Sequence, residues 1–210
     1  MIPEPTEDIL SCRLEKIRNQ SFGTLTLGFL GSIENESKGL EHAFRALSHA
    51  KADLPDFELR VLGPGDPDEW IQLATQVGIR SQVVFDGVLP SGRPVYGWLD
   101  KIDVYLHPRL QDGLPRSLIE AMSRGCPALS SKAGGIPELL PPSVTHEPGN
   151  WKELASHLTT FATDEDWMLE NAQLNFDTSK KYGRQKLKRK RNKFWGDFAS
   201  YVRKNSRNEK

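Results

Sequence analysis

Short apolar runs alternate with amphipathic stretches from about residue 24 to residue 147. The runs are TLTLGFLG, FELRVLG, VVFDG, VYLHP and PALSS, each bounded by Gly, Pro or Asp. Apolar runs of this length predict strands that are buried on both faces. Between the first two, residues 38–50 place Leu40, Phe44 and Leu47 on one helical face. The alternation predicts an α/β fold, with a Rossmann-like parallel sheet and helices on both faces.

Two segments of different character flank this alternation. Residues 1–20 are polar and are expected to be a lead-in or linker, residues 21–178 form the predicted α/β domain, and residues 179–210 are expected to form a helical C-terminal tail. Four apolar side chains recur at helical spacing in the tail: Leu187, Phe194, Phe198 and Val202. Basic residues cover its other faces, so the tail is predicted to be an amphipathic helix.

Charge divides the chain in two, although its net charge is zero. Residues 179–210 hold 13 Lys and Arg against two acids, while the preceding 178 residues hold 15 basic and 26 acidic residues. The basic run fits a solvated face, a surface that docks on the acidic part of the same chain, or a contact for anionic lipid headgroups. Nucleic acid is not expected as a partner, because no motif that reads nucleic acid accompanies the run.

Composition excludes several classes of protein. Hydrophobic residues make up 37% and charged residues 27%, which is typical of a globular chain. No apolar run approaches the roughly 18 residues of a spanning helix, and the start MIPEPTEDIL lacks the features of a signal peptide. We therefore expect a cytoplasmic protein, peripheral at the inner face of the membrane if the tail binds lipid. Cys12 and Cys126 are the only cysteines and no HExxH occurs, so neither a disulfide framework nor a bound metal is expected.

The stretch QDGLPRSLIEAMSRG combines a turn, a short helix and two acids. Pro115 suits a first helical turn and Gly125 suits a helix end, which predicts a helix of about ten residues. Free N–H groups in the turn before it and the positive end of the helix dipole favour an anion such as phosphate. The carboxylates of Asp112 and Glu120 would lie roughly 10 to 12 Å apart in helical geometry. That separation exceeds the about 5 to 9.5 Å of hydrolytic acid pairs. We expect the two acids to hold separate parts of one elongated ligand, such as a nucleotide sugar.

Further candidates follow the other predicted strands. In an open parallel sheet, ligands bind beyond the carboxyl ends of the strands. These positions carry Lys38 with Gly39, Gly63 in a Gly-Pro-Gly turn, Gly87, Asp112 with Gly113, and Gly134 with Gly135. A lysine can neutralise a diphosphate, and glycine allows close approach of the backbone. Taken singly, each signal also fits a structural reading: Asp112 as a helix cap, Glu120 as an exposed acid, Gly134 and Gly135 as turn formers, and His107 as a structural histidine.

Four segments resemble a known family. HPRLQDGLPRSLIEAMSRGCPALSSKAGGIPELL resembles the donor-site signature of the group 1 (family 4) retaining glycosyltransferases, and GFLGSIENESKGLEHAFRAL is similar to their phosphate-binding entry segment. RVLGPGD and VVFDGVL resemble the two segments between, so that the match runs from about residue 25 to 140. The resemblance implies the C-terminal, nucleotide-binding half of a GT-B enzyme. Such an enzyme moves a sugar from a nucleoside diphosphate to an acceptor hydroxyl without a metal, often in bacterial surface polysaccharide synthesis.

The resemblance also implies roles for individual residues. Glu120 would bind the ribose hydroxyls, and Asp112, one methylene shorter than the family's glutamate, would face the donor sugar as the catalytic candidate. Lys38 with Gly39 would hold the diphosphate, and Gly63 would border the nucleotide. The base would lie near the backbone of Val88 and Leu89. The phosphates would contact the turn made of Gly113, Leu114, Pro115 and Arg116.

Three departures from the family pattern change the expectation. Ser32 stands where the family usually has a diphosphate-binding arginine, and Arg109 stands where it usually has serine. We hypothesise that Arg109 or Arg116 replaces the lost charge. The family's N-terminal, acceptor-binding half has no counterpart in these 210 residues, so we expect the isolated chain to bind donor but to transfer little. The alternatives are a non-catalytic nucleotide or nucleotide-sugar binding module, and an epimerase or phosphorylase relative, against which the DGLP turn and the acid spacing argue.

Overall fold

A six-stranded parallel sheet forms the centre of the computed structural model, which describes residues 5–19 and 23–205. Every neighbouring pair of strands is parallel, which confirms the expected fold class. The spatial order is β3-β2-β1-β4-β5-β6. The strands are β1 (Leu25–Leu30), β2 (Phe57–Leu62), β3 (Val83–Gly87), β4 (Val104–His107), β5 (Ala128–Ser131) and β6 (Thr145–His146).

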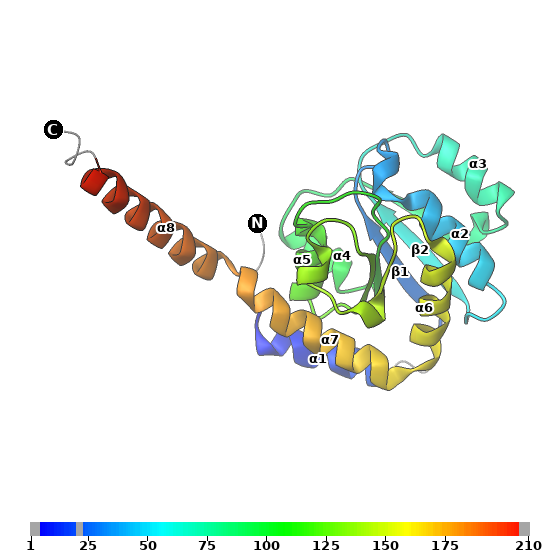
Figure 1. The fold of residues 1–210 in the computed structure, drawn as a ribbon. Helices are drawn as coiled ribbons and strands as arrows, with labels where there is room; N and C mark the ends of the chain where they lie inside the picture. The colour runs from blue at the N-terminus through cyan, green and yellow to red at the C-terminus, as the bar shows by residue number, and fades with distance from the viewer. Residues whose placement is uncertain (1–4, 20–22, 206–210) are drawn as a thin grey trace.

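Helices follow most strands and cover both faces of the sheet (Figure 1). The α-helices are α1 (Glu7–Arg18), α2 (Leu40–Ala50), α3 (Asp68–Gln76), α4 (Arg93–Leu99), α5 (Arg116–Ser123), α6 (Trp151–Thr163), α7 (Glu165–Ser179) and α8 (Arg184–Asn205). Short 3-10 turns complete the chain: η1 (Glu36–Lys38), η2 (Arg80–Gln82), η3 (Ile136–Glu138), η4 (Pro142–Val144) and η5 (Lys180–Tyr182). Helix α2 packs beside α6 on one face, while α5 packs against α4 and α7 on the other.

The central strands explain why the sequence shows unbroken apolar runs. Strand β4 is buried at all four positions and β1 at four of six, because helices cover both of their faces. The connection after β1 leads to one half of the sheet, and the connection after β4 leads to the other half. The order of the strands therefore reverses between β1 and β4. A crevice opens at such a point beyond the carboxyl ends of the two strands.

The structure differs from the expected polar lead-in over residues 7–18, which form helix α1. Leu10 and Ile17 are buried, and the helix packs against α7. Arg13 is buried as well, and its guanidinium donates to the carbonyls of Leu99 and Arg124, at 2.9 and 3.3 Å. The buried face of α1 is narrow and includes an arginine. The sequence of the segment therefore looks polar, although α7 covers one face of the helix.

The C-terminal tail is helical, as expected, but its helix α8 begins at Arg184 rather than at residue 179. Ser179 ends α7 and is buried, and η5 turns the chain between the two helices. Helix α8 then projects away from the body of the domain (Figure 1). Every described side chain from residue 184 to 203 is exposed, and residues 206–210 of the expected helix lie outside the described residues. No described helix has the length and apolarity needed to cross a membrane.

Candidate functional site

The candidate residues converge on the crevice between the loops that follow β1 and β4. The backbone N–H of Leu110 donates to the carbonyl of Ser37 at 2.9 Å, which joins the two loops. Gly39 has φ +78°, and a Cβ built there would lie 1.8 Å from the carbonyl oxygen of Pro108. Only glycine fits this contact. Gly39 therefore places Lys38 beside the β4 loop.

The loop after β5 packs against the same site from the other side. Gly134 has φ +55°, and a Cβ there would lie 1.8 Å from the carbonyl oxygen of Asp112. The N–H of Gly135 donates to the carbonyl of Gly113 at 2.8 Å. The two glycines expected as turn formers therefore also fix the Asp112-Gly113 turn. The loops after β1 and β5 therefore hold the β4 loop, which contains this turn, from two sides.

Helix α5 begins directly after that turn, with Pro115 at its N-cap. No side chain caps this helix end, and its first turn contains no acid and begins with Arg116. The N–H groups of a first helical turn have no partner within the helix, and the helix dipole makes this end positive. Leu114 is exposed beside it. The amino end of α5 thus has the chemistry of an anion site.

Asp112 is held by the protein through both of its carboxylate oxygens. Its Oδ1 accepts from the N–H of Gly113 at 2.8 Å, and its Oδ2 lies 3.2 Å from Nε2 of His107. The hydrogen bond from His107 lowers the pKa of Asp112, against the opposing effect of burial. The carboxylate is therefore ionised at neutral pH, and its position is fixed relative to the turn.

His107, the last residue of β4, is only 1% exposed. Burial lowers its pKa to about 4, although its hydrogen bond with Asp112 opposes the shift, and the charges of Arg109 and Lys38 lower the pKa further. The ring is therefore neutral, and a neutral ring that faces a carboxylate through Nε2 carries its proton there. Its Nδ1 faces the hydroxyl of Tyr105 at 3.4 Å. His107 thus holds the carboxylate of Asp112 in place.

Arg109 lies against the segment where the family pattern has an arginine and this chain has Ser32. Its side chain is almost fully buried, it donates from Nη2 to the carbonyl of Leu30 at 2.9 Å, and its guanidinium lies 5.7 Å from the ring centroid of Phe29. A Cβ on Gly31 would lie 2.7 Å from Nη2. Nη1 is buried without a hydrogen-bond partner among the described residues. The guanidinium of Arg109 thus lies beside Gly31, the neighbour of Ser32, whereas Arg116 is exposed at the start of α5.

Glu120 lies in the middle of α5 and is half-buried. Burial raises the pKa of its carboxyl, and the neighbouring charge of Arg116 opposes that shift. Burial also raises the pKa of Tyr96 on α4, and the charge of Glu120 adds to this effect. Glu120 therefore faces a region between α4 and α5 and not open solvent. Nothing in the sequence pattern indicates Tyr96 as its neighbour.

The remaining candidates divide into two groups. Lys38 is half-buried at the end of η1, and its ammonium makes no hydrogen bond or ion pair with another described residue. Val88 is 65% exposed after β3, and Leu89 beside it packs against the core. Gly63, by contrast, has a packing role, because its N–H donates to the carbonyl of Gly87 at 2.8 Å and a Cβ there would meet the carbonyl oxygen of Gly31 at 1.9 Å.

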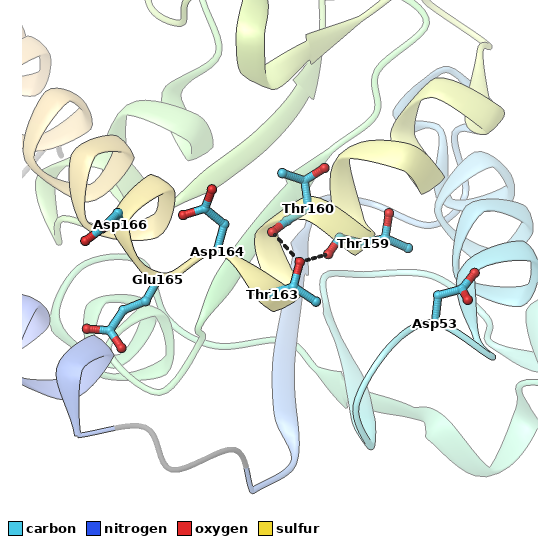
Figure 2. Close-up of a pocket in the computed structure, with 7 residues that line it drawn as sticks. All are labelled: Asp53, Thr159, Thr160, Thr163, Asp164, Glu165 and Asp166. Carbon is cyan, nitrogen blue, oxygen red and sulfur yellow. Dashed lines mark hydrogen bonds between the residues drawn. The ribbon is translucent and has the colours of Figure 1, made fainter.

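A broad surface depression lies elsewhere, at the corner between α6 and α7 (Figure 2). It is lined by Asp53, Thr159, Thr160, Thr163, Asp164, Glu165 and Asp166. The hydroxyl of Thr163 donates to the carbonyls of Thr159 and Thr160, and the side chain of Asp164 caps α7. These groups stabilise helix ends, and the surplus of acids is unfavourable for a phosphate. No group of three or more His, Cys, Asp and Glu in the described part of the chain could hold a metal ion.

An acidic depression also lies beside the candidate site, between η1 and α3. Its charged lining consists of Glu34, Glu36, Glu41, Asp66, Asp68 and Glu69. Like charge repels a phosphate from this depression. The electrostatics therefore favour an anion at the amino end of α5, whose first turn contains no acid.

The fold and the site together define a class of protein: an open α/β domain with a candidate anion site at the switch point of a parallel sheet. Residues 24–164 match the family described as Glycosyl transferases group 1. The chain belongs to this family, as the resemblance of its motifs predicted.

Individual relatives give the extent of the match. The Vi polysaccharide biosynthesis protein VipC/TviE of Salmonella typhi is 34% identical over 111 residues, which cover 52% of this chain and 18% of that protein. The C-terminal domain of the group 1 protein LpcC from Francisella tularensis has a TM-score of 0.71 at 22% identity, covering 87% of this chain and 97% of that domain. Anabaena Alr3699/HepE, solved in complex with UDP, has a TM-score of 0.73 at 20% identity. The match covers 90% of this chain and 55% of that protein.

The match covers 43% of the length of CapJ of Staphylococcus aureus and 35% of the length of the 2-deoxystreptamine glucosyltransferase of Streptomyces kanamyceticus, so the chain spans less than half of either relative. Its fold matches the isolated C-terminal domain of LpcC almost completely. The chain is therefore the C-terminal domain of a group 1 glycosyltransferase, with the GT-B architecture.

Proposed function

We propose that this domain binds the nucleotide-sugar donor of a retaining glycosyltransferase, which transfers a hexosyl group to an acceptor hydroxyl. One observation carries the proposal: the uncapped amino end of α5 lies at the β1/β4 crevice together with Lys38. Helix N–H groups and a lysine are the groups that hold a diphosphate. The UDP in the structure of HepE supports the same ligand class.

Each part of the donor has a proposed contact. The diphosphate binds the N–H groups of the turn at residues 113–116 and the ammonium of Lys38. Glu120 accepts hydrogen bonds from the ribose hydroxyls, and the backbone at Val88 and Leu89 borders the base. Asp112 faces the donor sugar, and its ionised carboxylate is positioned by His107 and Gly113.

The proposed mechanism depends on charge that develops on the leaving diphosphate. When the bond to the anomeric carbon breaks, negative charge grows on the phosphate oxygens. Preorganised helix N–H groups and Lys38 stabilise that charge more in the transition state than in the bound donor. The leaving phosphate itself accepts the proton of the acceptor hydroxyl, so no protein base is assigned. Because these groups neutralise the diphosphate, we propose metal-independent transfer, and excess EDTA is expected to leave donor affinity unchanged.

The proposed product is a bacterial surface polysaccharide or glycolipid, made at the cytoplasmic side. The similarity to VipC/TviE, a protein of polysaccharide biosynthesis, supports this class of product. The acceptor is proposed to bind a second, N-terminal half, of which the 210 residues contain no counterpart. The chain alone is therefore expected to bind donor and to transfer little sugar.

Calorimetry tests the donor site. The 210-residue chain is titrated with uridine, guanosine and adenosine diphosphates and with their sugars. We expect saturable binding of one base, and a loss of about 10-fold or more in affinity for Glu120→Ala, because charged hydrogen bonds contribute about 1.5–3 kcal/mol. Glu170→Ala, which alters an exposed acid on α7, is the matched control and should bind like the unchanged chain. Binding that is equal in both variants would contradict the assignment of Glu120.

A second candidate is a non-catalytic nucleotide-sugar binding module. Ser32 favours it, because the family's diphosphate arginine is absent at that position and Arg109, its nearest replacement, is buried. The two functions differ in turnover. Supplying the N-terminal half from a group 1 relative should produce transfer of sugar from the donor if the first proposal holds, and donor binding without transfer if the second holds.

A further inference from the structure

A buried chain of polar contacts joins the end of β1 to the turn that precedes α5. Arg109 donates from Nη2 to the carbonyl of Leu30 at 2.9 Å, and its Nε lies 3.5 Å from Nδ1 of His107. The other ring nitrogen of His107, Nε2, lies 3.2 Å from Oδ2 of Asp112. The hydroxyl of Tyr105 lies 3.4 Å from Nδ1 of His107. We call Arg109, His107 and Asp112 the Arg109 relay.

The backbone that carries the relay is fixed by its own turn and by β5. The N–H of Arg109 donates to the carbonyl of His107 at 2.9 Å, which closes a three-residue turn at the end of β4. The hydroxyl of Ser130 donates to the carbonyl of His107 at 2.9 Å, and that of Ser131 donates to the carbonyl of Arg109 at 2.5 Å. The side chains of Arg109 and His107 therefore start from a firmly held part of the chain.

A cation and a hydroxyl converge on Nδ1 of His107. The Nε–H of Arg109 can only donate, so Nδ1 accepts and the ring proton lies on Nε2. Burial lowers the pKa of His107 to about 4, and the charges of Arg109 and Lys38 lower it further, against the effect of Asp112. The buried ring is therefore a neutral donor whose N–H faces Asp112.

Burial separates Arg109 from a ligand in the crevice. The residue is 3% exposed, and its Nη1 is buried without a hydrogen-bond partner among the described residues. Gly31 covers the guanidinium, since a Cβ built there would lie 2.7 Å from Nη2 and 3.0 Å from Nη1. The side chain of Asp112, by contrast, is 19% exposed. Asp112 is thus the end of the relay that reaches the surface.

The guanidinium of Arg109 contributes geometry that another cation would not supply. Taking its charge out of water costs free energy, and Oδ2 of Asp112, 3.8 Å from Nε, offsets only part of that cost. Its planar fork, however, donates in two directions at once, to Leu30 and toward His107. The ammonium of a lysine lacks this fork.

We propose that Arg109 is a positioning residue for Asp112: through His107, it fixes the carboxylate relative to the end of β1. This inference rests on the proposed function, in which Asp112 faces the donor sugar. The loop after β1 also carries Lys38, the proposed contact of the diphosphate. The relay therefore sets the position of the acid relative to the diphosphate. It assigns Arg109 to the sugar end of the donor and not to the phosphates.

Calorimetry with the 210-residue chain tests this assignment. The measured quantity is the ratio of the affinities for UDP-glucose and UDP, or for the guanosine or adenosine pair if that base binds better. This ratio isolates the contribution of the sugar. Arg109→Met should lower the ratio about 5-fold or more, because the hydrogen bond from Asp112 to the sugar is no longer held in place, and should change the affinity for UDP less than about 2-fold. Asp112→Ala should lower the ratio at least as much.

Two further variants separate position from charge and from stability. Arg109→Lys keeps the charge but not the fork, so the ratio should fall as in Arg109→Met. Arg13→Met removes another buried arginine, 4% exposed, and should lower stability while the ratio stays unchanged. If Arg109→Met weakened the binding of UDP and Arg109→Lys restored it, Arg109 would be a phosphate cation, and the proposal would be overturned.

The middle of the relay offers variants that retain Arg109. His107→Gln can still donate from its amide to Asp112, whereas His107→Leu fills a similar space and cannot donate. We expect the ratio to stay within about 2-fold in the glutamine variant and to fall about 5-fold in the leucine variant. Circular dichroism checks that each variant is folded. Equal ratios in these two variants would overturn the relay.

Nitrogen NMR of the histidines tests the relay without a donor molecule. The signal of His107, assigned by its loss in His107→Gln, should be that of a neutral ring with its proton on Nε2. Arg109→Met should raise the pKa of His107, because a cation beside the ring is removed, and Arg109→Lys should raise it less. An unchanged pKa in Arg109→Met would overturn the relay. If the pKa rises but Asp112→Ala leaves the affinity ratio unchanged, the relay stands and the assignment of Asp112 to the donor sugar is overturned.

Discussion

A buried, neutral histidine controls the position of the candidate catalytic acid at the scale of single residues. His107 contacts Asp112 through one ring nitrogen and faces Tyr105 through the other, so that the ring cannot turn without losing both. Asp112 in turn holds the N–H of Gly113. The shorter side chain of Asp112, compared with the family's glutamate, is thereby tied closely to the turn that begins α5.

The pH dependence of stability should report the burial of His107. Its pKa is about 4 in the folded protein and 6.5 as the ordinary value, so the unfolded chain takes up the proton first as pH falls. Stability is therefore complete above about pH 6.5 and decreases as pH falls toward 4, by about 3 kcal/mol for this residue. The charged and titratable groups near the ring are Asp112, Arg109, Lys38 and Tyr105. None of them is substituted in the experiment.

The measurement compares urea unfolding of the unchanged chain and of His107→Gln across that range of pH. In the variant, the free energy of unfolding should change less with pH, because the contribution of His107 is lost. The contributions of the other histidines remain in both proteins. An identical slope in the two proteins would show that His107 is not held neutral by burial.

The close approach at Gly134 gives a second prediction. Gly134→Ala combines a positive φ with a Cβ 1.8 Å from the carbonyl oxygen of Asp112. We expect a loss of about 3 kcal/mol or more in the free energy of unfolding, because the backbone must shift. Gly78→Ala is the control, since its φ is +76° but nothing lies within 4 Å of the added Cβ. Its cost should be about 1 kcal/mol. Equal losses in urea unfolding would argue against the tight packing of the two loops.

The sequence alone predicted those parts of the candidate site whose residues are neighbours in the chain. The turn and helix of the DGLPRSLIE stretch form as expected, because proline and glycine fix local backbone geometry. The contacts of Arg109 with Leu30, and of Gly134 with Asp112, join segments far apart in the sequence and leave no local pattern. Gly63 was a candidate ligand contact for the same reason: a glycine forced by packing and one forced by a ligand look alike in a sequence.

Element order was predictable because buried parallel strands produce apolar runs with clear boundaries. Five of the six strands correspond to the five apolar runs. Strand β6 has only two residues, too few for a pattern. Helix α3 begins at Asp68 with Pro67 at its N-cap, and the carboxylate of Asp66 accepts from the N–H of Asp68. Helix α1 was missed because burial of an arginine is decided by tertiary contacts.

Arg13 should make α1 an integral part of the domain. Its guanidinium donates hydrogen bonds to the carbonyls of Leu99 at the end of α4, Ile102 before β4 and Arg124 at the end of α5. Arg13→Ala would leave these carbonyls without their donors, and we expect a loss of about 2–4 kcal/mol in the free energy of unfolding. Arg18→Ala, at an exposed position of the same helix, should change stability by less than about 0.5 kcal/mol. Denaturant unfolding checks both, and an unaffected Arg13→Ala would mean that α1 is dispensable.

The whole molecule separates an acidic, compact body from a basic, projecting helix. The composition showed this separation of charge, but the sequence could not show that α8 leaves the body, because an amphipathic pattern also fits a helix packed on its own domain. The exposure of its rings distinguishes the two arrangements.

Removal of α8 should therefore leave the body intact. A chain that ends at Gly183 loses only exposed side chains from the described part of α8. We expect its thermal unfolding midpoint to stay within about 3 °C of that of the complete chain, which corresponds to less than about 1 kcal/mol for a domain of this size. A large decrease, measured by calorimetry or circular dichroism, would show that α8 packs on the body in solution.

The central claim is that the amino end of α5 binds a diphosphate. A crystal of this chain soaked with the nucleoside diphosphate that binds best in calorimetry tests it most directly. The account predicts phosphate density within hydrogen-bond distance of the backbone N–H groups at residues 116–117 and of Nζ of Lys38, with the ribose at Glu120. Density for the diphosphate at any other place, with the amino end of α5 open to water, would contradict it.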